Sequence, residues 1–137
     1  MNKDSKWMQM ALTQAEKAES LGEVPIGAVL IKDETLIAQA YNQPILASDP
    51  TAHAEIKLLQ AAGKITNNYR LTGSTLYVTL EPCIMCLGAI MHARISQVIF
   101  GAYDPKTGAC ESVVNLKENK ELNRELLRIR GSFFKDN

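Results

Sequence analysis

The apolar side chains near the start of the chain recur at the spacing of one α-helical face. Between Lys6 and Leu21 they are separated by Gln, Lys and Glu, which is typical of a helix with one buried and one exposed side. Asp4 or Ser5 is suited to cap this helix, and Gly22 to end it. We therefore predict an amphipathic helix over residues 6–21.

The middle of the chain alternates between short apolar runs and longer mixed runs, with polar, Gly- or Pro-containing turns between them. By length and composition these runs predict strands over residues 26–31, 35–41, 75–80 and 97–101, and helices over residues 51–62 and 82–93. Gly63 is expected to close the first of these helices and Pro82 to open the second. Residues 42–50 are predicted to be a loop.

The order of these elements predicts an α/β fold. The short turn Lys32-Asp33-Glu34 joins the first two strands as a hairpin, and the later strands return through helical crossovers, which makes them parallel. Such crossovers place helices on both faces of the sheet. Beyond Gly108 the pattern is weaker, and residues 121–135 predict a final helix interrupted at Gly131. Without an internal repeat or linker, we expect one domain over residues 1–137.

Length and composition exclude several classes of protein. A chain of 137 residues, 46% of them hydrophobic, can bury a core without disulfide bonds. The longest apolar stretch, residues 83–91, is too short to span a membrane, and residues 1–6 show no secretory signal, so we expect a cytoplasmic protein. Fifteen basic residues balance fifteen acidic ones. The basic run from Arg124 to Lys135 is either a local basic patch or a solvated helix face.

Three residues form a ligand set for a metal ion. One imidazole and two thiolates suit a zinc ion that keeps its fourth tetrahedral position for water, and His53, Cys83 and Cys86 supply them. The two cysteines lie at the predicted start of a helix, where the helix dipole and free N–H groups favour thiolates. We therefore expect one zinc ion per chain.

Glu55 follows His53 by two residues and is expected to work beside the metal. At the first turn of a helix both side chains can flank an ion that lies beyond the helix end. A carboxylate there can take a proton from the activated water and return it to a departing nitrogen, so we assign Glu55 as a general acid and base and not as a ligand.

Two other readings of the cysteine pair remain. Cys83 and Cys86 could form a redox pair, but this reading gives His53 no role. They could also belong to a structural zinc site, which normally has a fourth protein ligand. His92 is the only other histidine, and it lies two turns into the same helix, where it is badly placed for that purpose. Cys110, in a Gly-containing loop, is expected to be unpaired.

The same residues carry a resemblance to a known family. His53-Ala54-Glu55 followed by Pro82-Cys83-Ile84-Met85-Cys86 resembles the signature of the zinc-dependent cytidine and adenosine deaminase superfamily. Within this superfamily, the sequence most resembles the bacterial tRNA-specific adenosine deaminases, almost without gaps from about Trp7 to Asn123. Those enzymes convert the wobble adenosine of an arginine tRNA anticodon to inosine. Five segments carry it, at residues 23–29, 49–55, 68–71, 75–83 and 101–109.

The resemblance implies a three-layer α/β/α fold of the cytidine-deaminase type, one zinc ion, a homodimer and a tRNA anticodon stem-loop as partner. It also implies that Asn42 hydrogen-bonds the flipped-out base, and that Asp104 and Lys106 contact the anticodon strand. From the residues alone, Asn42 could equally form an Asx turn before Pro44, and residues 104–108 could be an ordinary turn.

The end of the chain departs from the family pattern. Family members continue after Asn123 with a fifth strand and a longer final helix, so we expect the fifth strand to be absent and the fourth to be exposed at the sheet edge. Glu111 stands where the family commonly has glycine. Other functions therefore stay open, namely a shortened deaminase acting on adenine or cytosine in single-stranded DNA, a deaminase of free bases or nucleosides, and a non-catalytic zinc-stabilised RNA-binding subunit.

Overall fold

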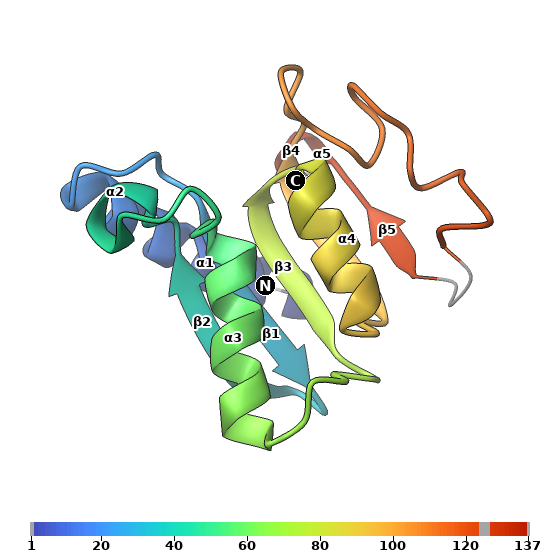
Figure 1. The fold of residues 1–137 in the computed structure, drawn as a ribbon, viewed down its shortest axis with the longest axis horizontal. Coiled ribbons are helices and arrows are strands. Elements are labelled where there is room, and N and C mark those ends of the chain that lie inside the picture. Colours follow the sequence, from blue (N-terminus) through green and yellow to red (C-terminus); the bar gives the residue numbers. More distant parts are fainter. Residues whose placement is uncertain (1, 124–126, 137) are drawn as a thin grey trace.

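A computed structural model describes residues 2–123 and 127–136, and shows a five-stranded sheet with helices on both faces (Figure 1). The elements in chain order are α1 (Lys3–Ser20), β1 (Gly27–Lys32), β2 (Thr35–Tyr41), α2 (Pro44–Ala47), α3 (Ala54–Thr66), β3 (Thr75–Leu80), α4 (Ile84–His92), β4 (Gln97–Ala102), β5 (Arg128–Arg130) and α5 (Phe133–Asp136). This arrangement confirms the predicted α/β class and its three layers.

The sheet is mixed, with strand order β2-β1-β3-β4-β5. β1 pairs with β2 as the predicted hairpin and with β3 on its other side, both in antiparallel fashion. β3, β4 and β5 are parallel to one another. α3 leads into β3, and α4 leads into β4. Because these two strands are parallel, both helices begin near the same edge of the sheet (Figure 1).

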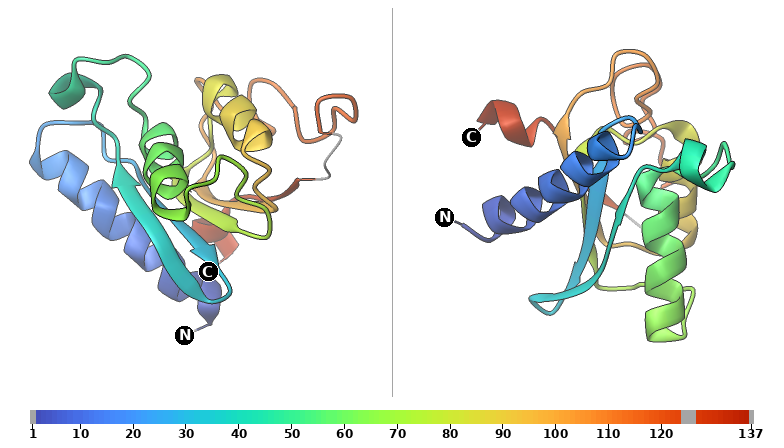
Figure 2. Two further views of the ribbon diagram at one scale, coloured as in Figure 1. Left: turned by 60° about the horizontal axis from the view of Figure 1, so that its bottom comes forward. Right: turned by 90° about the vertical axis from the view of Figure 1, so that its left-hand side faces the viewer.

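The two faces of the sheet bury separate cores. On one face α1 packs through Trp7, Met8 and Ala11, and at Gly27 the backbones approach so closely that an added Cβ would lie 2.1 Å from the Ala11 carbonyl oxygen. The other face packs against α3 and α4 through side chains such as Leu58. Figure 2 shows α1 on the opposite side of the sheet from α3. In the described ranges no helix is long and apolar enough to cross a membrane.

Several predicted boundaries shift by a few residues for identifiable reasons. α1 begins at Lys3 and not at Lys6, because the side chain of Asn2 caps it by accepting from the Ser5 N–H at 2.8 Å. α3 begins at Ala54 and continues through Gly63 to Thr66, where Asn67 adopts the left-handed conformation that ends the helix.

The predicted loop over residues 42–50 contains the short helix α2. The Glu23 carboxylate holds its first turn by accepting from the N–H groups of Ile45 and Leu46, at 3.2 and 2.7 Å. Because the stabilising group is 22 residues away along the chain, the local pattern could not show this helix.

The prediction for the C-terminal region is wrong in two respects. The fifth strand is present, since β5 pairs in parallel with β4 over Arg128–Arg130 and covers that part of its edge. Residues 121–135 are not one helix, because residues 121–123 form a turn and the chain is extended before the short α5. Arg124, the first residue of the predicted basic run, lies outside the described residues.

Candidate metal centre and active site

His53 and Cys83 occupy equivalent places in two neighbouring helices. His53 is the residue before α3 and Cys83 the residue before α4, and both have extended backbones with φ −69° and −77°. Neither side chain caps its own helix, so both are free to turn toward the space between the two helix starts. Cys86 reaches the same space from the first turn of α4.

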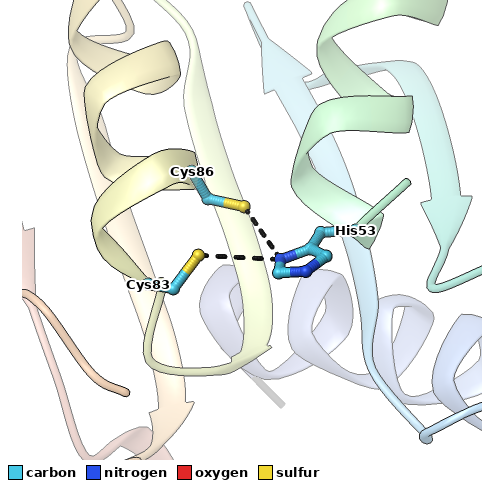
Figure 3. Close-up of side chains that lie close together, drawn as sticks. All are labelled: His53, Cys83 and Cys86. Carbon is cyan, nitrogen blue, oxygen red and sulfur yellow. Dashed lines mark hydrogen bonds between the residues drawn. The ribbon is translucent and has the colours of Figure 1, made fainter. Parts of the chain in front are cut away.

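The three side chains converge on one point (Figure 3). The His53 Nδ1 lies 3.6 Å from the Cys83 Sγ and 3.4 Å from the Cys86 Sγ, and all three ligand atoms lie within 4.8 Å of one another. Two such ligands of a tetrahedral zinc ion are separated by about 3.5 Å, given Zn–S and Zn–N bonds of about 2.3 and 2.1 Å. The donor set and its spacing therefore fit zinc.

The protonation states of the two cysteines also suit a metal ion. The Cys86 thiol and nearby groups stabilise the Cys83 thiolate and lower the pKa of Cys83 to about 5, while the same contact raises the pKa of Cys86. A thiolate beside a thiol and an imidazole binds a divalent ion with release of one further proton. Among the described residues, no fourth His, Cys, Asp or Glu joins the group, so it does not have the four protein ligands of a closed structural site.

Glu55 is buried in the first turn of α3, directly beside the ligands. Its side chain is 4% exposed and hydrogen-bonds Cys86, and burial is the main reason why the pKa of Glu55 rises to about 7. A cavity of about 50 Å³ adjoins it, which is large enough for water. Its walls are formed by Ile26, His53, Glu55, Leu80, Glu81, Cys83, Asp104 and Thr107.

Only one of the three predicted substrate-contact residues lines this cavity. Asp104 lines it, whereas Lys106 is exposed on the same turn and Asn42 is buried after β2; neither of these is among its lining residues. The Oδ1 of Asn42 is buried and has no hydrogen-bond partner in the described structure. An Asx turn would need an N–H two residues further on, where Pro44 has none.

The turn over residues 104–108 is built by Asp104 itself. Its carboxylate accepts from the backbone N–H groups of Lys106 and Thr107, at 2.9 and 3.3 Å, and from the Thr107 hydroxyl at 2.8 Å. Burial raises the pKa of Asp104, but these hydrogen bonds outweigh it and leave the pKa below its ordinary value. The side chain therefore has a local structural role in addition to its place in the cavity wall.

The two remaining candidate ligands lie elsewhere. His92 is exposed and lines a separate groove beside α4. Cys110 is a free, fully buried thiol, as expected, and burial raises the pKa of Cys110 to about 12. Cys83 and Cys86 are free as well, and their orientation toward His53 favours the metal reading over a redox pair.

Sequence reasoning gave no role to Glu81, which the structure places in the wall of the cavity. Its side chain is 2% exposed and accepts hydrogen bonds from the loop after β4. The sequence around Pro82 could not predict this role of Glu81, because the groups that donate hydrogen bonds to its carboxylate lie 23 to 31 residues further along the chain.

Comparisons with known proteins show similarity to deaminases. The family model of MafB19-like deaminases matches residues 1–137. The tRNA-specific adenosine deaminase of Haemophilus influenzae is 52% identical over 124 residues, which cover 90% of this chain and 72% of that protein.

Two solved structures are also similar. One comes from biochemical and structural studies of A-to-I editing by tRNA:A34 deaminases at the wobble position of transfer RNA. It has a TM-score of 0.90 and 41% sequence identity, and the match covers 95% of this chain and 99% of that chain. The X-ray structure of guanine deaminase from Bacillus subtilis has a TM-score of 0.72 and 39% identity, with 75% and 66% covered. This chain therefore belongs to the MafB19-like deaminase family, among its tRNA-specific adenosine deaminases.

Proposed function

We propose that this chain hydrolyses the 6-amino group of adenosine in a tRNA anticodon loop, at the wobble position, and leaves inosine. The observation that carries the proposal is the group of His53, Cys83 and Cys86 beside the buried Glu55, with a water-sized cavity adjoining them. Zinc, when bound by the three side chains, acts as a Lewis acid that makes water nucleophilic near neutral pH.

The protein's own groups then move the protons. The Glu55 carboxylate accepts one proton from the attacking water and passes it to the ring nitrogen. It then takes the second proton from the hydroxyl group now on C6 and passes it to the amino group, which leaves as ammonia while the C6=O bond forms. Burial of Glu55 keeps the transfer away from bulk water. Its position in the first turn of α3, two residues after His53, sets this carboxyl beside the metal ligands without making it one of them.

Recognition of the base and of its strand is assigned to Asn42, Asp104 and Lys106. The unpaired, buried Oδ1 of Asn42 is an acceptor that a flipped-out adenosine can satisfy, and an unpaired loop base costs less to extrude than one in a duplex. Asp104 and Lys106 are assigned to the anticodon strand, where exposed Lys106 offers a cation to phosphate.

A panel of substrates tests the proposal. The zinc-loaded chain is incubated with an anticodon stem-loop carrying adenosine at the wobble position, single-stranded DNA with adenine or cytosine, free adenosine, cytidine and guanine, and the products are identified by nucleoside mass spectrometry. We expect inosine from the stem-loop at the highest rate. The similar guanine deaminase makes free guanine the sharpest competitor, and faster conversion of guanine would replace the proposed substrate.

We further infer that the chain forms a homodimer, as the family resemblance implies, and that it acts in the cytoplasm, where a tRNA substrate is found. Exposed apolar side chains border the groove beside α4, with Ile84 61% and Leu122 58% exposed, and a second copy is suited to cover them. Sedimentation velocity across a range of concentrations tests this, and a monomer throughout that range contradicts it.

A further inference from the structure

One buried carboxylate holds the first part of the loop after β4. Glu81 stands between the end of β3 and Pro82, and both of its oxygens accept from this loop. Oε1 accepts from the Asp104 N–H at 3.0 Å and from the Ser112 hydroxyl. Oε2 accepts from the N–H groups of Cys110, Glu111 and Ser112, at 3.0, 2.8 and 3.0 Å.

The backbone of the loop closes around this carboxylate. At Gly108 an added Cβ would lie 2.3 Å from the Glu81 Oε1 and 2.6 Å from the Asp104 carbonyl oxygen, so only glycine fits there. A buried charge is tolerated where several N–H and O–H dipoles point at it, and this loop supplies five such donors. The loop and the carboxylate therefore require each other.

This tether connects the loop to the reactive part of the molecule. Glu81 is two residues before Cys83 and lines the same cavity as His53 and Glu55. Asp104, whose N–H is held by Glu81, lines that cavity too and organises the turn that presents Lys106. The bond from the Asp104 N–H to Oε1 therefore holds the start of this turn near the metal ligands, together with the backbone bonds Glu81 N–H to the Ala102 carbonyl and Ala109 N–H to the Pro82 carbonyl on either side of it.

We propose that Glu81 is a positioning residue that fixes the turn over residues 104–107 beside the metal ligands and thereby sets the affinity for the nucleic-acid strand. This role rests on the proposed function, in which Asp104 and Lys106 contact the anticodon strand. Glu81 itself does not touch the reacting atoms.

Glu81→Gln tests the proposal because it removes one acceptor and keeps the size of the side chain. The remaining carbonyl oxygen is expected to stay with the three N–H donors at the Oε2 position, so the new NH2 group faces the Asp104 N–H and detaches it. We expect the Kd and KM for the anticodon stem-loop to rise about tenfold, the scale of one lost hydrogen bond to a charged group. We expect kcat to stay within about threefold, because chemistry at the metal is untouched.

Glu111→Gln is the matched control. It also removes one negative charge, from the loop that Glu81 holds, but the Glu111 side chain pairs with Lys117 at 3.3 Å, and only the backbone N–H of Glu111 donates to Glu81. We expect wild-type Kd, KM and kcat for this variant. Ser112→Ala is a milder variant that removes a single donor from Oε1, and it keeps the test available if Glu81→Gln does not fold.

Zinc content and amide hydrogen exchange complete the design. In Glu81→Gln we expect wild-type zinc stoichiometry and faster exchange at the amides of residues 104 and 110–112; Ser112→Ala should show a smaller increase. Unchanged exchange, or a fall in kcat and zinc content at unchanged Kd, overturns the proposal. If the wild-type chain makes no inosine from the stem-loop, the proposed function fails, whereas the exchange rates still decide whether Glu81 holds the loop.

Discussion

Replacement of Glu55 is expected to separate catalysis from metal binding. We expect Glu55→Gln to lower kcat about 10³-fold, because a carboxamide of the same size cannot accept a proton from water. The zinc content should not change, since Glu55 is outside the ligand group. Single-turnover formation of inosine and metal analysis of the same sample measure the two quantities.

Glu55→Ala extends this test to the non-catalytic reading. A subunit that uses zinc only for stability has no need of a proton-transfer group, so its function would survive the loss of the carboxyl group. If both Glu55→Gln and Glu55→Ala still formed inosine at the wild-type rate, another group would have to transfer the proton. A loss of zinc in Glu55→Gln would instead make the carboxyl a ligand.

We expect replacement of Asn42 to act differently on stability and on activity. Its buried Oδ1 has no partner in the described structure, and a buried unpaired acceptor costs about 1–3 kcal/mol. We therefore expect Asn42→Ala to leave the melting temperature unchanged or higher, while kcat/KM for the stem-loop falls about 10- to 100-fold. A lower melting temperature would show that the side chain stabilises the fold and is not reserved for a base.

The three side chains of the candidate metal centre could be predicted from the sequence to lie together, because their spacing is one that local structure preserves. A Cys-x-x-Cys pair at a helix start and a histidine at another helix start meet wherever the two helices begin at the same sheet edge. Glu81 could not be found in this way. Its five donors come from a loop whose path is fixed only by the folded chain.

Asp4 connects three elements on the far side of the sheet. From the first turn of α1 it accepts from the Tyr77 hydroxyl on β3, at 2.5 Å, and from the Arg130 guanidinium on β5, at 2.7 Å. Burial raises the pKa of Asp4, but these two bonds outweigh it and leave the pKa below 3.8. The bonds anchor the short strand β5 at the edge of the sheet.

A depressed pKa gives this contact a defined pH dependence. The contribution of the Asp4 carboxylate to the free energy of unfolding is fully present above its pKa in the unfolded chain, near 3.8. It is lost as the pH falls through the lower pKa that Asp4 has in the folded chain. We expect Asp4→Asn to lower the free energy of unfolding by about 0.5–1 kcal/mol at pH 7, and the difference to shrink toward pH 3. Urea denaturation at both pH values measures it.

The exposed ion pair of Lys3 and Glu34 provides the control for Asp4. It also involves the start of α1, but both side chains are about 70% exposed or more, so Glu34→Gln should not change the urea midpoint measurably. A difference for Asp4→Asn that stayed constant between pH 7 and pH 3 would exclude its carboxylate as the source.

The C-terminal elements show why a short strand is harder to predict than a metal site. In β5 the buried Ile129 lies between exposed Arg128 and Arg130, which is the alternation of a strand, but three residues are too few to exclude a helix. Leu122, Ile129 and Phe133 also recur at helical spacing. The pairing with β4 decides between the two, and pairing partners far apart in the sequence leave no local pattern.

Zinc is expected to stabilise the molecule as a whole, because its three ligands join α3 to α4 across the sheet edge. A ligand that binds only the folded chain contributes about 2.7 kcal/mol at a free concentration 100 times its Kd, which corresponds to about 10 °C in melting temperature for a domain of this size. We expect a chelator to lower the melting temperature by about that amount in the wild type. The same loss is expected in Cys110→Ala, because Cys110 is outside the ligand group.

Cys83→Ser should have a low melting temperature with or without the chelator, since it lacks one ligand. If Cys83→Ser responded to the chelator like the wild type, the stabilising ion would be bound elsewhere, and the assignment of these three side chains to zinc would be wrong.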